Sequence, residues 1–221
     1  MQKAKKSGFW MDFVPYLRLP ILISLPNEPL LEKWARLFRF LATYQTVHSI
    51  LSEKKTAWVL DIGCGQDILY YKFLKIVARD HFRYVGIDPL IIPKKGKGYE
   101  IRKATFEESA ISQKFDVIVM HAVLEHVDDP KSLLKFAIKH LSPDGKIVVT
   151  TPTPGAQKLL EFLAHYIGIL SAREIDEHKN YFTKESLQKL AKPLHVQLIH
   201  RYFEFGLNNF VEICHSGKGG D

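Results

Sequence analysis

The chain has 221 residues, of which 46% are hydrophobic and 25% are charged. This near-average composition excludes a disordered, collagen-like or disulfide-scaffold protein, and the length fits one domain with a large core and a modest appendage. The formal net charge of +7 suggests a nucleic-acid partner only if the charge is spread over the domain.

The positive charge is concentrated at one end of the chain. Residues 1–55 hold nine Lys and Arg against four Asp and Glu, whereas the remaining residues hold 22 against 20. The main domain is therefore nearly neutral, and we do not expect nucleic acid as its partner.

Cysteine content and apolar runs restrict the compartment. Cys64 and Cys214 are too few for a disulfide framework or for a zinc site of their own, so we expect a cytoplasmic protein without a bound metal. The apolar run Leu19–Leu25 is far shorter than the roughly 20 residues that span a bilayer. Phe9 and Trp10 lie near Lys and Arg, so peripheral membrane contact through residues 1–29 is an alternative.

The first expected element is an amphipathic helix. Apolar residues recur with a spacing of three to four from Leu30 to Leu51, which is the period of a helix with one buried face. We expect residues 1–55 to form an extension that carries a lid helix.

From Ala57 onward, short apolar strands alternate with helices, which is typical of a parallel sheet covered on both faces. Expected strands are Ala57–Asp61, Tyr84–Asp88, Tyr99–Lys103, Phe115–Met120 and Lys146–Thr151. Expected helices are Leu69–Ala78 and Lys131–Leu141, and Ser142–Gly145 reads as the turn that follows.

The last third is expected to add two helices and a hairpin. The helices are Ala156–Leu170 and Lys184–Ala191, the second capped by Thr183. Two β-rich runs, Val196–Phe203 and Leu207–Cys214, are joined near Gly206 and should pair antiparallel. Residues 56–215 would then form the main domain, and 216–221 a tail.

The most informative motif is Val59–Gly65, where an apolar strand ends in an acid and enters a Gly-x-Gly turn. Such a turn lets the backbone approach a ligand closely. Asp88 ends the next strand, where a carboxylate can accept hydrogen bonds from ribose hydroxyls. Ile68 stands where a dinucleotide fingerprint needs a third Gly, so phosphate binding is not supported.

With three further segments, these motifs resemble the class I S-adenosylmethionine-dependent methyltransferases, in particular their type 11 and type 23 branch. The resemblance runs in colinear order through Val59–Gly65, Val85–Pro89, Phe115–Val127, Leu141–Lys146 and His178–Thr183. It implies an α/β, Rossmann-like sheet of seven strands in the order 3-2-1-4-5-7-6, with the last strand antiparallel, and an N-terminal helical lid.

The resemblance also implies S-adenosyl-L-methionine as cofactor and assigns the residues around it. Asp61, Gly63, Cys64 and Gly65 would surround the methionine part, with Gln66 beside them. Asp88 would hold the ribose, with Pro89 flanking the adenosine. Thr105 and Phe106 would contact adenine, and His121 and Val123 would lie beneath the reactive methyl group.

Two departures from the family pattern motivate a rival hypothesis. Asp67 replaces the usual third glycine, where it can cap the next helix or crowd the pocket, and Thr105 replaces a common acid. A non-catalytic protein that kept the fold is therefore one alternative. An RNA methyltransferase is another, motivated by the basic N-terminus and by Lys and Arg residues between 94 and 103.

The expected reaction is methylation of an oxygen atom, with nitrogen or carbon as the alternatives. An alcohol or phenol must lose a proton, and His is the side chain best matched to neutral pH. His126 and His178 are the candidate catalytic residues, against structural roles for both in holding their loops. The segments expected around the acceptor are rich in aromatic and apolar residues, which favours a small or a lipid- or glycan-linked metabolite. The oligomeric state stays open.

Overall fold

The computed structural model describes residues 29–65, 67–78, 82–167 and 172–216, without the side chains of residues 30, 173 and 174. Gln66 and most of the expected membrane-contacting segment 1–29 lie outside the described residues. No helix in the described ranges has both the length and the apolar character needed to cross a bilayer.

One sheet of eight strands forms the centre, in the order β3-β4-β2-β1-β5-β6-β8-β7. Without β3 this is the expected order 3-2-1-4-5-7-6, and β8 is antiparallel to both of its neighbours. The additional edge strand β3 escaped prediction because it has three residues and little apolar content. The strands are β1 (Ala57–Ile62), β2 (Phe82–Asp88), β3 (Lys94–Gly96), β4 (Tyr99–Lys103), β5 (Phe115–His121), β6 (Leu141–Pro152), β7 (Val196–Phe203) and β8 (Asn208–His215).

Strand β6 is longer than expected and absorbs the turn predicted at Ser142–Gly145. Phe115 of β5 pairs with Leu141, but Val117 pairs with Lys146, so the register shifts between them. A Cβ at Gly145 would lie 3.0 Å from the carbonyl oxygen of Phe115. The turn residues therefore form a bulge held against β5, and glycine is needed for that close approach.

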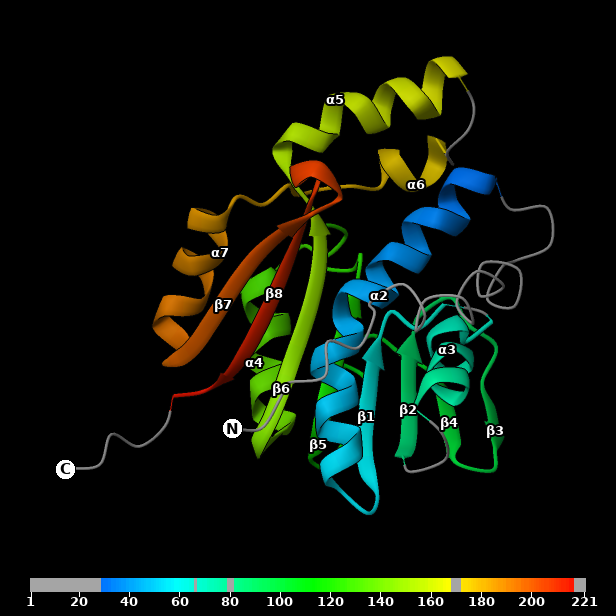
Figure 1. Cartoon of the computed structure of the whole chain (residues 1–221), viewed down its shortest axis with the longest axis vertical. Helices are drawn as coiled ribbons and strands as arrows, with labels where there is room; N and C mark the ends of the chain where they lie inside the picture. The colour runs from blue at the N-terminus through cyan, green and yellow to red at the C-terminus, as the bar shows by residue number, and fades with distance from the viewer. Residues whose placement is uncertain (1–28, 66, 79–81, 168–171, 217–221) are drawn as a thin grey trace, which may run out of the picture.

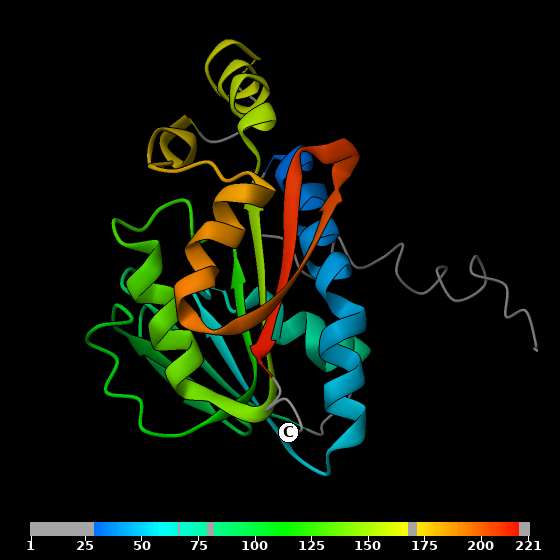
Figure 2. The ribbon, with the colours of Figure 1, turned by 90° about the vertical axis from the view of Figure 1, so that its left-hand side faces the viewer.

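Helices cover both faces of the sheet (Figures 1 and 2). Helices α2 (Leu30–Glu53) and α3 (Leu69–Val77) lie on one face, and α4 (Pro130–His140) and α7 (Lys184–Ala191) lie on the other. Alternate strand residues supply the two cores: Val117 and Val119 face the first pair, and Ile118 and Met120 face the second.

Helix α2 is part of the domain core. Leu37, Phe40 and Val47 are buried in the same cluster as the strand residues, and Thr46 donates a 2.8 Å hydrogen bond to Glu212 of β8. The helix that we expected as a lid therefore covers one face of the sheet, and residue 55 does not separate two packing units.

Caps define the helices on the other face. The Asp129 side chain accepts a 3.0 Å hydrogen bond from the backbone N–H of Ser132, and Pro130 opens α4. Thr183 caps α7 as expected, in a reciprocal pair with Ser186. Short 3₁₀ turns at Lys192–Leu194 and Glu204–Gly206 flank β7.

A small cap projects beyond the carboxyl ends of the strands (Figure 1). The apolar helix expected at Ala156–Leu170 is present as α5 (Pro154–Phe162), continued by the π-helical turn η2 (Leu163–Ile167), and its expected last three residues lie outside the described ranges. It is followed by α6 (Ala172–Asp176). A π turn widens a helix locally and is frequent at functional sites. Because the cap lies beyond the carboxyl ends of the strands, a ligand bound above the sheet would contact it.

Candidate active site

The turn after β1 has the backbone shape that a closely bound ligand needs. Gly63 and Gly65 have φ angles of 72° and 66°, which L side chains rarely adopt. The Gly63 N–H donates a 2.8 Å hydrogen bond to Ile87, which ties the turn to β2. A Cβ at Gly63 would overlap the side chain of Val123, whereas nothing lies within 4 Å of the corresponding position at Gly65. The turn is therefore closed toward Val123 and open at Gly65.

Asp88 lies at the end of β2 beside this turn. One carboxylate oxygen accepts a 3.1 Å hydrogen bond from the Gly65 N–H, and the other accepts a 2.8 Å bond from the Leu90 N–H. The side chain is half-buried. It is therefore fixed in orientation, as a ribose-binding acid must be.

Asp61 lies beneath the turn and is buried. Burial raises the pKa of its carboxyl to about 7. A hydrogen bond from Tyr84 opposes this shift, and the carboxylate of Asp88 contributes to it. The Asp61 side chain is thus tied to Tyr84 of β2, a partner that sequence reasoning missed.

The other residues expected to bind the cofactor differ in burial and in their contacts. The Cys64 side chain points into the core, 2.7 Å from where a Cβ at Gly86 would lie, so only its backbone lines the turn. Pro89 is exposed. Thr105 forms a turn with Glu108, and the Phe106 ring packs 5.8 Å from Phe136.

Helix α2 reaches His121 at the end of β5. The Thr43 hydroxyl donates to the Phe40 carbonyl at 3.0 Å and lies 3.1 Å from His121 Nε2. The hydroxyl proton is thereby used, so Nε2 carries the ring proton and Nδ1 keeps its lone pair. Burial lowers the His121 pKa to about 3, which keeps the ring neutral.

Asp67 does not cap the following helix. Helix α3 begins at Leu69, and its N-cap position is Ile68, with a φ of 46° and no side-chain cap. The left-handed turn at Ile68 moves the helix start beyond the reach of Asp67. An open glycine turn beside a fixed carboxylate nevertheless remains, and these groups fit S-adenosylmethionine.

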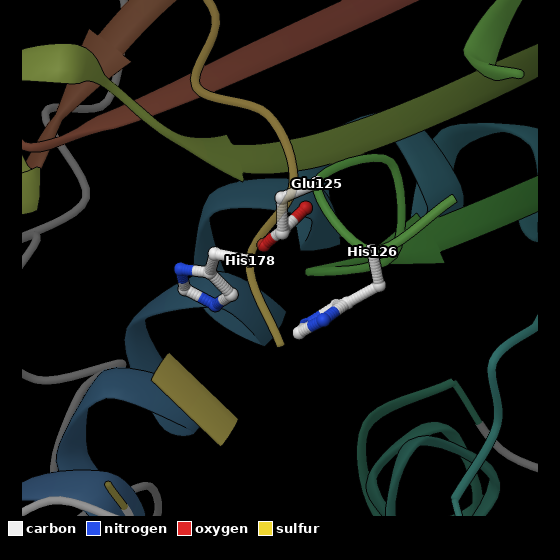
Figure 3. A group of neighbouring side chains, drawn as sticks. All are labelled: Glu125, His126 and His178. Atoms are coloured by element: carbon white, nitrogen blue, oxygen red, sulfur yellow. The ribbon is translucent and has the colours of Figure 1, made fainter. Parts of the chain in front are cut away.

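A second group of side chains lies beyond Val123. Glu125 and His126 belong to the loop after β5, and His178 belongs to the segment between α6 and α7. One ligand-type atom from each lies within 4.8 Å of the others, and Figure 3 shows the three side chains converging. Glu125 is fully buried, and its carboxylate oxygens make no hydrogen bond of ordinary geometry to the described residues. The backbone N–H of Glu125 and the Thr151 side chain still act on the carboxylate, since both lower its pKa.

Each of the two histidines is oriented by a contact at its Nδ1 atom. His126 Nδ1 lies 3.2 Å from the Glu177 carbonyl oxygen, which can only accept, so Nδ1 carries the proton of the neutral ring and Nε2 keeps a lone pair. His178 Nδ1 lies 3.0 Å from the Tyr181 hydroxyl. The two imidazole rings are 4.7 Å apart.

Burial also sets the charge of this group. It raises the pKa of Glu125 to about 7. The pKa of His178 falls to about 4 because of burial and then because of the nearby His126. His178 is therefore neutral at pH 7, and Glu125 is poised between its two states.

The loop and the segment are joined along their length. Four hydrogen bonds and one ion pair connect residues 125–128 with residues 177–180. These are Lys179 N and Asn180 N to the Glu125 carbonyl, Asn180 Nδ2 to the Val127 carbonyl, His126 Nδ1 with the Glu177 carbonyl, and Lys179 Nζ with Asp128. His178 is thus held beside Glu125 although more than 50 residues separate them.

Glu125, His126 and His178 are also residue types that bind divalent metals, and their spacing can accept one ion. Sequence reasoning named both histidines but not Glu125. The signal was present, since a Glu beside a candidate His after a parallel strand is a polar residue at the edge where ligands bind.

A family model described as a methyltransferase domain matches residues 26–199. The chain is 27% identical to the ubiquinone biosynthesis O-methyltransferase of Aeromonas salmonicida over 143 residues. The aligned region covers 61% of this chain and 60% of that protein. The protein with the same description from Actinobacillus pleuropneumoniae is 35% identical over 108 residues, covering 42% and 44%. The chain thus spans less than two thirds of these relatives.

Solved structures share the fold. The plantazolicin methyltransferase BpumL, in complex with a monoazolic desmethylPZN analogue and SAH, superposes with a TM-score of 0.64 at 13% identity, covering 94% of this chain and 92% of that one. The CurJ carbon methyltransferase superposes with a TM-score of 0.61 at 13% identity, covering 83% and 56%. The fold by itself therefore does not select the acceptor atom.

Proposed function

Because the chain belongs to the family of methyltransferase domains, we propose that it transfers the methyl group of S-adenosylmethionine to a hydroxyl oxygen of a small acceptor. The observation that carries the choice of oxygen is the convergence of Glu125, His126 and His178 beside Val123, where a hydroxyl proton can be taken up. The O-methyltransferase relatives support the same choice.

The cofactor side is formed by the end of β1 and the end of β2. Gly63 and Gly65 would hold the methionine part against the backbone, and Asp88 would accept hydrogen bonds from the ribose hydroxyls. When bound, S-adenosylmethionine supplies an electrophilic methyl group on a positively charged sulfur. Val123 closes the turn from the other side and would shield the reacting atoms from water.

The acceptor side needs a base that takes up the hydroxyl proton and a group that positions the hydroxyl oxygen. In the proposed reaction the acceptor oxygen forms a bond to the methyl carbon, the carbon–sulfur bond breaks, and the sulfur becomes a neutral thioether. The hydroxyl proton goes to His126 Nε2, whose lone pair is set by the Nδ1 contact with Glu177. Glu125 in its ionised form stabilises the resulting imidazolium, and neutral His178 positions the hydroxyl.

The test uses 4-methylcatechol as a hydroxyl-bearing probe, with formation of SAH and of the O-methylated product as readouts. We expect His126→Ala to lower kcat by roughly 100-fold or more, as is typical for loss of a general base. The affinity for SAH should stay unchanged. His200→Ala is the matched control, because His200 lies on β7 and is paired with Asn209.

Three outcomes would contradict the proposal. Failure of the wild-type protein to bind SAH in calorimetry would favour the non-catalytic alternative. Methylation of RNA, with affinity falling steeply as salt rises, would favour the RNA alternative. Full turnover by His126→Ala would remove that residue from the catalytic group.

A further inference from the structure

A pocket of about 440 Å³ lies between the cap helices and the segment that carries His178. One wall is α5 with its π turn η2, the other is α6, and the floor is the segment between α6 and α7. The lining residues are Gln157, Glu161, His165, Tyr166, Ile175, Asp176, His178 and Tyr181. This volume suits one ring-sized molecule with short substituents.

His178 belongs both to this pocket and to the group around Glu125. Because residues 177–180 are fastened to residues 125–128, the pocket floor and the proton-accepting loop keep one relative position. A molecule in the pocket can therefore contact His178 on one side and present a hydroxyl toward His126. No other pocket residue contributes to that group.

The described lining is polar and contains two carboxylates. Glu161 accepts a 2.9 Å hydrogen bond from Gln157, and Asp176 pairs with His165 at 3.0 Å. Burial and then the charge of Glu161 raise the pKa of Tyr181. Glu161 and Tyr181 thus face the same pocket, one from α5 and one from its floor.

Two kinds of ligand group fit such a lining. Hydroxyl and ammonium groups find carboxylate acceptors that are already oriented by their partners. A carboxylate or phosphate would face Glu161 and Asp176 at short range and be repelled. The rings of Tyr166 and Tyr181 also line the pocket, where they can contact an aromatic ligand.

We propose that this pocket binds the methyl acceptor and that the acceptor is a hydroxyl-bearing ring that is neutral or cationic, not acidic. The inference rests on the proposed function, because it assigns the substrate class of the same reaction. Glu161 and Asp176 determine the charge preference, and His178 connects the pocket to the site of proton transfer.

The test compares three catechols that differ in one substituent: dopamine, 4-methylcatechol and 3,4-dihydroxyphenylacetate. Their affinities are measured by calorimetry on the full chain saturated with SAH, without turnover. We expect the acid to bind roughly tenfold or more weakly than the other two. In the double variant Glu161→Gln, Asp176→Asn this difference should fall below about threefold.

Two further variants test whether the effects arise in the pocket, and not from a change in the overall charge or in folding. Glu53→Gln, Asp144→Asn removes two exposed carboxylates, one at the end of α2 and one near the start of β6, which lie at the end of the sheet away from the cap, and should keep the wild-type ranking. Gln157→Trp fills the pocket from an exposed position of α5 and should weaken all three catechols roughly tenfold, with SAH affinity unchanged.

The outcomes distinguish the two proposals. Absent SAH binding overturns the proposed function and the pocket assignment with it. Normal SAH binding overturns the pocket assignment alone if the acid binds as tightly as dopamine, or if no catechol binds. The same holds if Gln157→Trp leaves catechol binding intact or if the double variant keeps the full ranking.

Discussion

The two halves of the candidate active site are built in different ways. The cofactor side comes from the ends of adjacent parallel strands, and its shape depends on backbone: two glycines with positive φ and an Asp held by two N–H groups. The acceptor side depends on side chains from distant segments, and its buried Glu125 makes no hydrogen bond of ordinary geometry to the described residues. Backbone geometry is intolerant of substitution, whereas the side-chain group is sensitive to charge and pH.

The largest expected effect concerns the backbone side. Gly63→Ala places a Cβ against Val123 at a φ of 72°. Strain and overlap together should lower SAH affinity by roughly 100-fold or more, measured by calorimetry.

Gly206→Ala is the control for Gly63→Ala, because Gly206 has a φ of 85° and nothing within 4 Å of its added Cβ. It should keep the wild-type affinity for SAH. The double variant Gly63→Ala, Val123→Ala removes the overlap and should recover part of the lost binding. Equal losses in Gly63→Ala and Gly206→Ala would show that the contact with Val123 is unimportant.

Asp88→Asn should have the next largest effect. The change keeps the size of the side chain but removes its charge, and hydrogen bonds to a charged acceptor contribute about 1.5–3 kcal/mol. We therefore expect SAH binding to weaken roughly 10- to 100-fold in calorimetry. Asp128→Asn changes an acid on the acceptor side, paired with Lys179, and should leave SAH affinity unchanged. An equal loss in both variants would erase the distinction between the two sides.

A smaller effect is expected in the pH dependence of stability. The folded pKa of Glu125, about 7, lies above the unfolded value, so the folded state binds the proton more tightly and wild-type stability falls as pH rises toward 7. Glu125→Gln removes this dependence. Relative to wild type, the variant should gain about 2 kcal/mol between about pH 5 and about pH 6.5 in urea unfolding.

Asp61 titrates in the same range but is present in both proteins, so its contribution cancels in that comparison. A pH-independent difference between wild type and Glu125→Gln would mean that Glu125 does not hold its proton as its burial implies.

The smallest expected effect tests how the acceptor side works. If the proton is taken up by His126 directly, dialysis against EDTA should leave methylation of 4-methylcatechol unchanged. Loss of activity that Mg²⁺ or Zn²⁺ restores would instead assign Glu125, His126 and His178 to a bound ion.

The same contrast explains what sequence could predict. The strand order follows from the family resemblance, and the glycine turn and Asp88 are local features of contiguous segments. The position of His178 against Glu125 could not be read from the chain, because it depends on hydrogen bonds between segments about 50 residues apart. The burial of α2 was missed because its apolar stripe fits a core helix and a lid helix equally well. The helix expected from Ala156 was predicted correctly, but its change from α to π geometry at Leu163 could not be read from the spacing of its apolar residues.

The attachment of residues 177–180 to residues 125–128 has a consequence for how such a protein can diversify. The cap between β6 and α7 enters and leaves the domain at the carboxyl ends of the strands. Two of the contacts that fix its far end are backbone hydrogen bonds to the Glu125 carbonyl, which do not depend on side-chain identity. A different cap can therefore be exchanged between these two points without altering the glycine turn or Asp88. The domain would keep its methyl donor while acquiring a new acceptor.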